Sequence, residues 1–379
     1  MPVQNYENLD TNSDITTTRT LLHEVIPLTG TIVSGTYGIF PNDSNIKNYT
    51  HGMFQSVYDY PYLSSSANHI FDLTVGYDET SPISGSTATQ NAKKINLYNQ
   101  YAQTLLGYTG STTDGVRKFE NDGTLNGTGS MLNCFFVNFS RLLTKDQIKK
   151  GSFSITLGTG SYDNPFAGTR TFFDISASVN GGTYNTVGGD YGLLISSASN
   201  GGHNQCHGVV FYQAGVAILS ASVFDSGSHG PAGAGQPVRD LGAPEFQFQS
   251  GSAYGLPPAT SDGAYRSVSG AFANSSISGT CDAFRRRIQN LSFNNTTEIN
   301  SKIYFCRVPH NKFNYSSNPT YASGSKIVVK EVATDTPVSY ITTVGLYSAA
   351  NELLATAKLS VPIKKDPTQE LILRVRLDY

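Results

Sequence analysis

The feature that most constrains this fold is the regular alternation of apolar and polar residues near the end of the chain. In the segment 371–378, the residues Leu371, Leu373, Val375 and Leu377 alternate with Ile372, Arg374, Arg376 and Asp378. Successive side chains of a strand point to opposite faces, so this pattern predicts a strand with one buried face. Strands are also predicted at 326–330, 338–347 and 352–359, with Ser348-Ala349-Ala350-Asn351 as a hairpin turn. We therefore expect an antiparallel β-sandwich region over residues 301–379.

The composition extends the β prediction to the whole chain of 379 residues. The sequence has 37 Gly, 22 Tyr and 20 Phe, and charged residues make up 14%, against roughly 25% in ordinary soluble domains. Turn-forming and aromatic residues favour strands over helices. We predict a mainly β fold: an antiparallel β-sandwich or jelly-roll-like body with two or three short helices.

The net charge and the aromatic content each exclude one class of protein. A formal net charge of −2 leaves no basic excess for neutralising phosphates, so we expect no nucleic-acid partner. The many Tyr and Phe residues exclude a solvated disordered tail, because such a tail has few groups to bury.

Three segments of the chain are predicted to be helical. Residues 89–106 place apolar side chains on one face, with Thr89 as the N-cap and Gly107 at the end. A capping-box pattern in Thr144-Lys145-Asp146-Gln147 predicts a short helix that links two strands. A third helix is predicted from Phe284, Ile288 and Leu291 around Arg285-Arg286-Arg287, and these arginines are interpreted as a solvated face or as intersubunit ion pairs.

The middle of the chain reads as further strands. They are predicted at 134–143, 152–157, 172–179, 191–196, 209–212 and 216–224. Gly215 separates the last two as a tight turn or a bulge.

The domain organisation has three parts. Residues 1–20 are polar and form an N-terminal extended arm, either frayed or ordered against a neighbouring subunit. Residues 21–300 form the β-rich body, which contains a long Gly/Ser-rich excursion over 226–280, either flexible or ordered only by a partner. Residues 301–379 form the C-terminal sandwich region, and the sequence leaves open whether that region continues the body.

The chain carries no predicted targeting or membrane segment. The start has no positive region followed by an apolar one, so no signal peptide is expected. The apolar run 208–224 is too short and too polar for a membrane span. We therefore expect folding in a cytosol, with Cys134, Cys206, Cys281 and Cys306 as buried free thiols.

Candidate catalytic and metal-binding groups are few. His203, Cys206 and His207 are the only metal-like cluster, but the set lacks a fourth ligand, and a polar loop is the favoured interpretation. Ser228 and His229 are adjacent, which seldom gives a nucleophile and its base. No Gly-x-Ser-x-Gly elbow and no Gly-Lys dipeptide are present. We predict no catalytic residue, no cofactor and no enzymatic activity, although paired carboxylates acting on sugars stay open.

Several segments resemble virion structural proteins of tailed bacteriophages, especially phages of cyanobacteria and other aquatic bacteria. The resemblance is carried by 313–320, 338–347 and 351–360, and by the shorter stretches 54–63 and 138–143. A Gly-Leu-Tyr followed by Glu-Leu-Leu-Ala is also similar to β domains of tail-fibre and baseplate proteins. The family is defined by occurrence in virions, so the resemblance implies no catalytic residues.

These observations lead to one leading expectation. The chain is expected to be a non-enzymatic structural component of a phage virion, in the tail or baseplate, assembled in the host cytoplasm. Its expected partners are copies of itself and other virion proteins, without a membrane. The alternatives are a head, neck or capsid-decoration protein, and a tail module that binds a host surface glycan through its tyrosines.

Overall fold

The computed structural model describes most of the chain. The described residues are 6–27, 44–109, 115–121, 129–158, 166, 168–174, 184–196, 205–224, 268–285, 287–315, 322–323, 326–327, 332 and 334–379. Several sequence predictions lie wholly or partly outside this part: residues 1–5 of the arm, 175–179 of the predicted strand 172–179, His203, residues 226–267 of the excursion with Ser228 and His229, Arg286, residues 316–320 and residues 328–330.

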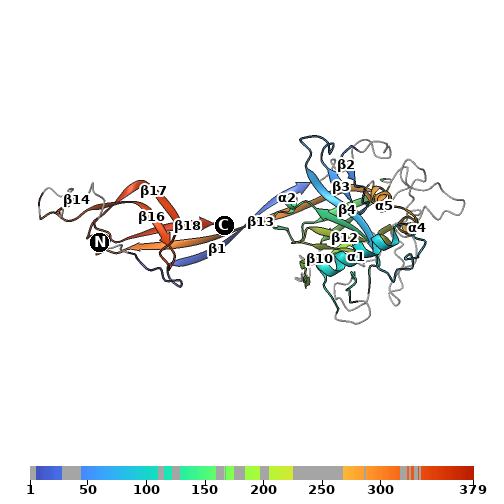
Figure 1. Cartoon of the computed structure of the whole chain (residues 1–379), viewed down its shortest axis with the longest axis horizontal. Coiled ribbons are helices and arrows are strands. Elements are labelled where there is room, and N and C mark those ends of the chain that lie inside the picture. Colours follow the sequence, from blue (N-terminus) through green and yellow to red (C-terminus); the bar gives the residue numbers. More distant parts are fainter. Residues whose placement is uncertain are drawn as a thin grey trace. The chain divides into compact units, whose positions relative to one another are not determined.

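The predicted fold class is confirmed. The structure is mainly β, with 49% strand and 14% helix, and is built on a large antiparallel sheet with few helices. It divides into two compact units. We call residues 23–297 the body, and residues 1–22 together with 298–379 the terminal unit (Figure 1). Strands β1 (Ile15–Pro27) and β13 (Ile288–Val308) contribute residues to both.

The body is organised around one extended antiparallel sheet. Its strands follow the order β13-β7-β8-β10-β11-β12-β5-β4-β3-β2, with β6 paired to β13 and β9 to β10. Their bounds are Ile46–Asn48 for β2, Gln55–Tyr58 for β3, His69–Tyr77 for β4, Asn133–Phe139 for β5, Gln147–Ile148 for β6, Ser154–Gly158 for β7, Thr169–Asp174 for β8, Tyr184–Thr186 for β9, Gly189–Ser196 for β10, Gln205–Phe211 for β11 and Val216–Ser220 for β12. Every pair of neighbours in this order is antiparallel, as predicted for the body.

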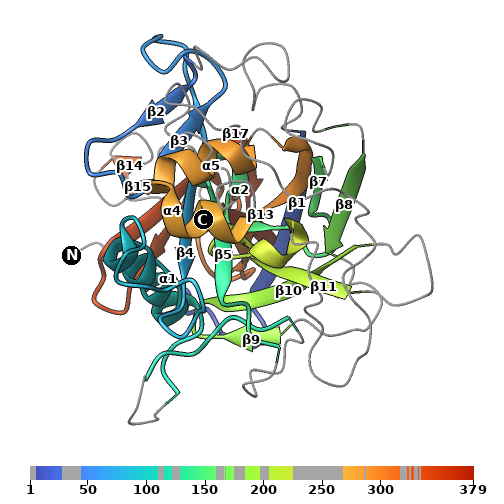
Figure 2. The ribbon, with the colours of Figure 1, turned by 90° about the vertical axis from the view of Figure 1, so that its right-hand side faces the viewer.

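Both faces of the body sheet are covered by apolar side chains. One face carries Phe135, Leu219 and other core residues, which pack beneath helices α4 (Val268–Asn274) and α5 (Ile277–Arg285). The opposite face carries a second cluster that includes Phe136 and Phe211 and packs under helix α1 (Asn91–Leu105). Figure 2 shows α4 and α5 over the middle strands and α1 beside them. This double coverage explains why strands such as β12 are buried along their whole length.

The helix prediction was correct for α1 except for its N-cap, and the capping-box prediction was wrong. Helix α1 matches the predicted 89–106, yet its N-cap is Gln90 in a left-handed conformation, and the Thr89 hydroxyl donates to the Asn274 carbonyl instead. Helix α2 (Arg141–Thr144) ends where the capping box was expected to start a helix. Lys145 follows with φ 55°, which stops the helix, and the chain then enters β6.

The prediction of a helix through Phe284, Ile288 and Leu291 was also wrong in extent. Helix α5 ends at Arg285, and β13 begins at Ile288. Residues 268–280, assigned to the excursion, form α4 and much of α5, with Phe272 and Ile277 in the core. In contrast, Gly215 lies in the predicted turn, with φ 68°, a conformation that favours glycine.

The terminal unit is built from strands alone in its described part. Strand β18 (Leu371–Asp378) pairs with the end of β13, in a register that sets Val375 opposite Tyr304. Strands β16 (Ser339–Tyr347) and β17 (Leu353–Lys365) form a hairpin through the predicted turn 348–351. The short strands β14 (Ala322–Ser323) and β15 (Lys326–Ile327) pair with each other.

The described N-terminal residues contact their own chain rather than forming a separate arm. Residues 15–20 lie in β1, which is next to β13 in the sheet order. The Asp14 carboxylate accepts a hydrogen bond from Arg307 at 2.8 Å, and Lys312 pairs with Glu7 at 2.5 Å. The segment 6–20 is therefore part of the terminal unit.

Candidate interaction surface

The terminal unit has almost no apolar core of its own. Among the described residues, only Ile303, Val308 and Val375 are buried apolar side chains of this unit, and all other such side chains lie in the body. Many large apolar side chains of the terminal unit are exposed instead: Tyr6, Leu21, Leu22, Tyr315, Val332, Tyr340, Tyr347, Leu353, Leu354, Val361, Ile372 and Tyr379. Solvent exposure of this much apolar surface is unfavourable unless another surface covers it.

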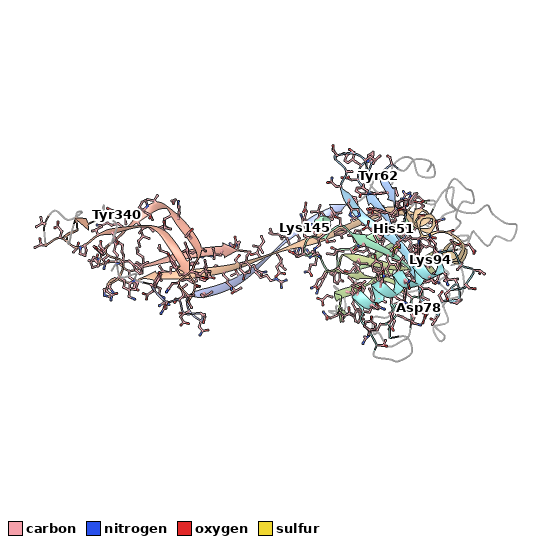
Figure 3. The ribbon with its side chains drawn as sticks, in the orientation of Figure 1. His51, Tyr62, Asp78, Lys94, Lys145 and Tyr340 are labelled. Atoms are coloured by element: carbon pink, nitrogen blue, oxygen red, sulfur yellow. The ribbon has the colours of Figure 1, made fainter. Side chains whose placement is uncertain are left out.

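The β16–β17 hairpin concentrates this exposed surface. It carries Tyr340, Tyr347, Leu353, Leu354 and Val361, and Tyr340 is labelled in Figure 3. On β16 only Ser339 is buried; Ile341, Val344 and Leu346 are half-buried and both tyrosines are exposed, so the strand has no face that is covered as a core face would be. We refer to the exposed apolar residues of β16 and β17 as the ribbon surface.

The edges of this hairpin are as open as its faces. Within the described part of the chain, β16 pairs only with β17, and β17 pairs only with β16. A two-stranded hairpin by itself is marginally stable in water. From Ser339 to Ala357 the only charged residue is Glu352, so β16 lacks the charges that usually protect an exposed edge.

A large bulge shapes the second strand of the hairpin. Ile341 pairs with Ile363 and Thr343 pairs with Lys358, so the residues between Lys358 and Ile363 are not matched on β16. Pro362 lies in this bulge, where its missing N–H breaks no ladder bond. Val361, which is 70% exposed, projects from the same bulge.

Hydrogen bonds of a buried lysine help to hold the terminal unit together in place of an apolar core. The Lys365 side chain is fully buried, and its Nζ donates to the His310 carbonyl at 3.3 Å, to Asn314 Oδ1 at 2.6 Å and to the Asp366 carbonyl at 2.8 Å. These bonds anchor the end of β17 to the segment that follows β13. The unit is thus ordered by specific hydrogen bonds, while its apolar side chains remain available.

The metal-ligand candidates from the sequence do not form a site in the described residues. Cys206 and His207 are neighbours on β11, so their side chains point to opposite faces of the sheet. Cys206 Sγ donates to the Gly208 carbonyl, and His207 packs edge-on against Phe172. In the part of the chain that the structure covers, no three His, Cys, Asp or Glu side chains gather as a metal site.

Burial explains the electrostatics of His207. Desolvation, with a smaller contribution from the charge of Arg170, lowers the pKa of His207 to about 4. The imidazole is therefore neutral at pH 7 and acts as a core side chain. His203, its predicted companion, lies outside the described residues.

The predicted solvated face is wrong for two of the three arginines, and Arg286 lies outside the described residues. Arg285 and Arg287 are buried, not solvated: Arg285 pairs with Asp282, and Arg287 donates to the Gly158 carbonyl. All four cysteines are free thiols, and Cys134 and Cys281 are buried. Burial raises the pKa of both buried thiols, which keeps them protonated and unreactive.

Comparisons of the chain with protein-family models, with curated proteins and with solved structures gave no match. In the described residues, no helix is both long and apolar enough to cross a membrane.

Proposed function

We propose that this chain is a non-enzymatic structural component of a tailed-phage virion, in the tail or baseplate, that works through repeated contacts between copies of itself. The observation that carries the proposal is the terminal unit, whose apolar residues are exposed on the ribbon surface instead of being buried in a core. The resemblance of 313–320, 338–347 and 351–360 to virion proteins supports the same role, because these segments lie in the same unit.

A second copy of the chain is the occupant that fits the ribbon surface best. The unpaired edges of β16 and β17 can accept strands of the same kind. Between Ser339 and Ala357 the hairpin carries one charge, on Glu352, and the whole chain has a net charge of −2, so identical copies meet little repulsion along this stretch. Tyr and Leu side chains are suitable anchors at the centre of such an interface.

The mass of the protein in solution tests self-association. Light scattering coupled to size exclusion should give a multiple of the 40.7 kDa monomer for the full chain. The double variant Leu354→Ser, Val361→Ser should shift the protein toward monomer, because it removes two apolar side chains from the ribbon surface. A monomeric wild type would contradict the proposal.

The body offers a matched control for this experiment. Leu142 is 73% exposed and Leu354 is 69% exposed, so the two leucines differ in unit and not in accessibility. Leu142→Ser should leave the oligomer intact. If Leu142→Ser dissociates the oligomer as much as the double variant does, the ribbon surface is not the interface.

The place in the virion requires a separate measurement. Mass spectrometry of gradient-purified particles should detect the chain in a fixed ratio to the other virion proteins, and an antibody to it should label the tail end by electron microscopy. Labelling of the head or neck would favour a decoration or neck protein instead. Absence from purified particles would overturn the virion role while leaving self-association untouched.

A further inference from the structure

A cluster of aromatic and polar side chains lies on the outward face of the first strands of the body. Ser56 pairs with Lys47 on one side and with Asp72 on the other, so these three side chains share one face of the β2–β3–β4 sheet. The other face carries Val57 and Phe71, which belong to the core. We call Tyr49, Ser56, Tyr58, Tyr62, His69 and Asp72 the β2–β4 cluster.

Hydrogen bonds connect the polar members of this cluster. Asp72 Oδ1 accepts from the Ser56 hydroxyl at 2.5 Å and lies 2.8 Å from His69 Nε2. The Ser56 hydroxyl also lies 3.3 Å from the Tyr49 hydroxyl. Both bonds to Asp72 use the same carboxylate oxygen, so the second oxygen is left to accept a hydrogen bond from a ligand.

Aromatic rings border this polar chain. The Tyr58 ring lies 6.4 Å from the Tyr62 ring and 5.5 Å from the His69 ring, between centroids. Desolvation raises the pKa of Tyr58, and the neighbouring Tyr49 and Asp72 raise it further. The Tyr58 hydroxyl therefore stays protonated and can donate a hydrogen bond. Tyr62, which Figure 3 labels, is exposed beside Tyr58, and Tyr60 of the same loop is exposed as well.

The loop that carries the exposed tyrosines is held in place. The Asp59 carboxylate accepts hydrogen bonds from the Asn68 backbone N–H at 2.6 Å and from the Asn68 side chain at 2.8 Å, which closes the loop between them. The Tyr62 backbone N–H donates to the Ser44 carbonyl at 3.0 Å. A ligand would therefore meet side chains that are already ordered, which lowers the entropic cost of binding.

We propose that the β2–β4 cluster binds a neutral sugar. A hexose presents an apolar C–H face beside a ring of hydroxyls, and the cluster presents tyrosine rings beside a carboxylate, an imidazole and hydroxyls. Asp72 and Lys47 share this face and carry opposite charges, so the face has no net charge to favour an acidic or a basic sugar, and a neutral sugar fits better. The proposal concerns the body alone and holds whether or not the copies assemble through the ribbon surface.

Saturation-transfer NMR of the full chain tests this binding. The probes are the methyl glycosides of glucose, galactose, mannose and N-acetylglucosamine. At least one should receive saturation from the protein and bind saturably. Asp72→Asn and Tyr62→Ala should each weaken that binding about tenfold or more, because each removes a contact of the kind that dominates such sites.

Tyr108→Ala is the matched control, because Tyr108 is an exposed tyrosine of the same unit that lies outside the cluster. The Tyr108→Ala protein should bind the glycoside with the affinity of the wild type. The melting temperatures of Tyr62→Ala and Tyr108→Ala should agree. The proposal is overturned if none of the four glycosides receives saturation. It is equally overturned if Tyr108→Ala weakens binding as much as Tyr62→Ala, or if Tyr62→Ala leaves the affinity unchanged.

Discussion

The body and the terminal unit are made of similar residues but bury them differently. In the body, Phe135 stacks on Phe284 with 4.3 Å between ring centroids, inside a continuous aromatic core. In the terminal unit, large apolar side chains such as Leu354 and Ile372 face solvent. Strand-forming sequence alone therefore does not produce a core, because a core needs a second layer, and the described part of the terminal unit supplies none.

Buried lysines show a second difference between the units. Lys94 of α1 donates to the carbonyls of Phe272 and Ser275, at the end of α4, and is labelled in Figure 3. Burial lowers the pKa of Lys94 to about 8. Lys94 joins a helix to a large apolar core, whereas Lys365 joins the end of β17 to the segment after β13 in a unit with few buried apolar side chains.

The largest effect is expected in the core of the body. Phe135→Ala should lower the free energy of unfolding by about 3–5 kcal/mol, because it leaves a cavity between Phe284, Phe272 and Phe224. Urea denaturation followed by near-ultraviolet circular dichroism measures this loss. The terminal unit should still self-associate at low temperature. A loss below about 1 kcal/mol would show that Phe135 is not part of a close-packed core.

Acid should destabilise the body through His207. The pKa of His207 is about 4 in the folded protein against 6.5 ordinarily, so between these values only the unfolded chain binds the proton. Stability should therefore fall as the pH is lowered from 6.5 to 4, by about 3 kcal/mol at the lower end. His207→Leu should remove this part of the pH dependence, measured as the difference between the two denaturation series. If wild type and His207→Leu lose stability equally between pH 6.5 and pH 4, His207 is not the group responsible.

The third effect should be confined to the terminal unit. Val375 is one of the three buried apolar residues in the described part of the terminal unit, so Val375→Asp would bury a charge there and should cost about 2–3 kcal/mol. We expect loss of the oligomer by light scattering with an unchanged melting transition of the body. Ile372→Asp is the matched control, since Ile372 is exposed on the other face of β18. Equal effects of the two changes would show that the face of β18 is misassigned.

The strands were predictable because alternation is a local signal. The pattern of Leu371, Leu373 and Val375 indicated both the strand and its inner face, and the burial of β18 follows it. Helix α1 was predictable for the same reason, since its apolar residues repeat at helical spacing.

The errors arose where tertiary contacts decided the outcome. Thr144-Lys145-Asp146-Gln147 satisfies a capping pattern, yet Lys145 adopts φ 55° and the chain enters β6 beside β13. Arg287 appears solvated in the sequence, but the Gly158 carbonyl, far away in the chain, accepts its hydrogen bond. The ribbon surface could not be predicted either, because alternation reports that a face is apolar and not which layer covers it.

The smallest loss of stability is expected when the hydrogen bonds of the buried Lys365 in the terminal unit are removed. Lys365→Met keeps most of the side-chain length but removes the donors to Asn314 Oδ1 and to the carbonyls of His310 and Asp366. The acceptors can regain water in this thin unit, so the cost should be about 1–2 kcal/mol. Hydrogen exchange should then speed up in β17 and around Asn314, and not in β4 or β5. Lys358 is an exposed lysine of the same strand, so Lys358→Met should change neither the stability nor the exchange in β17. If exchange is unaltered in Lys365→Met, apolar contacts and not the Lys365 hydrogen bonds hold the unit.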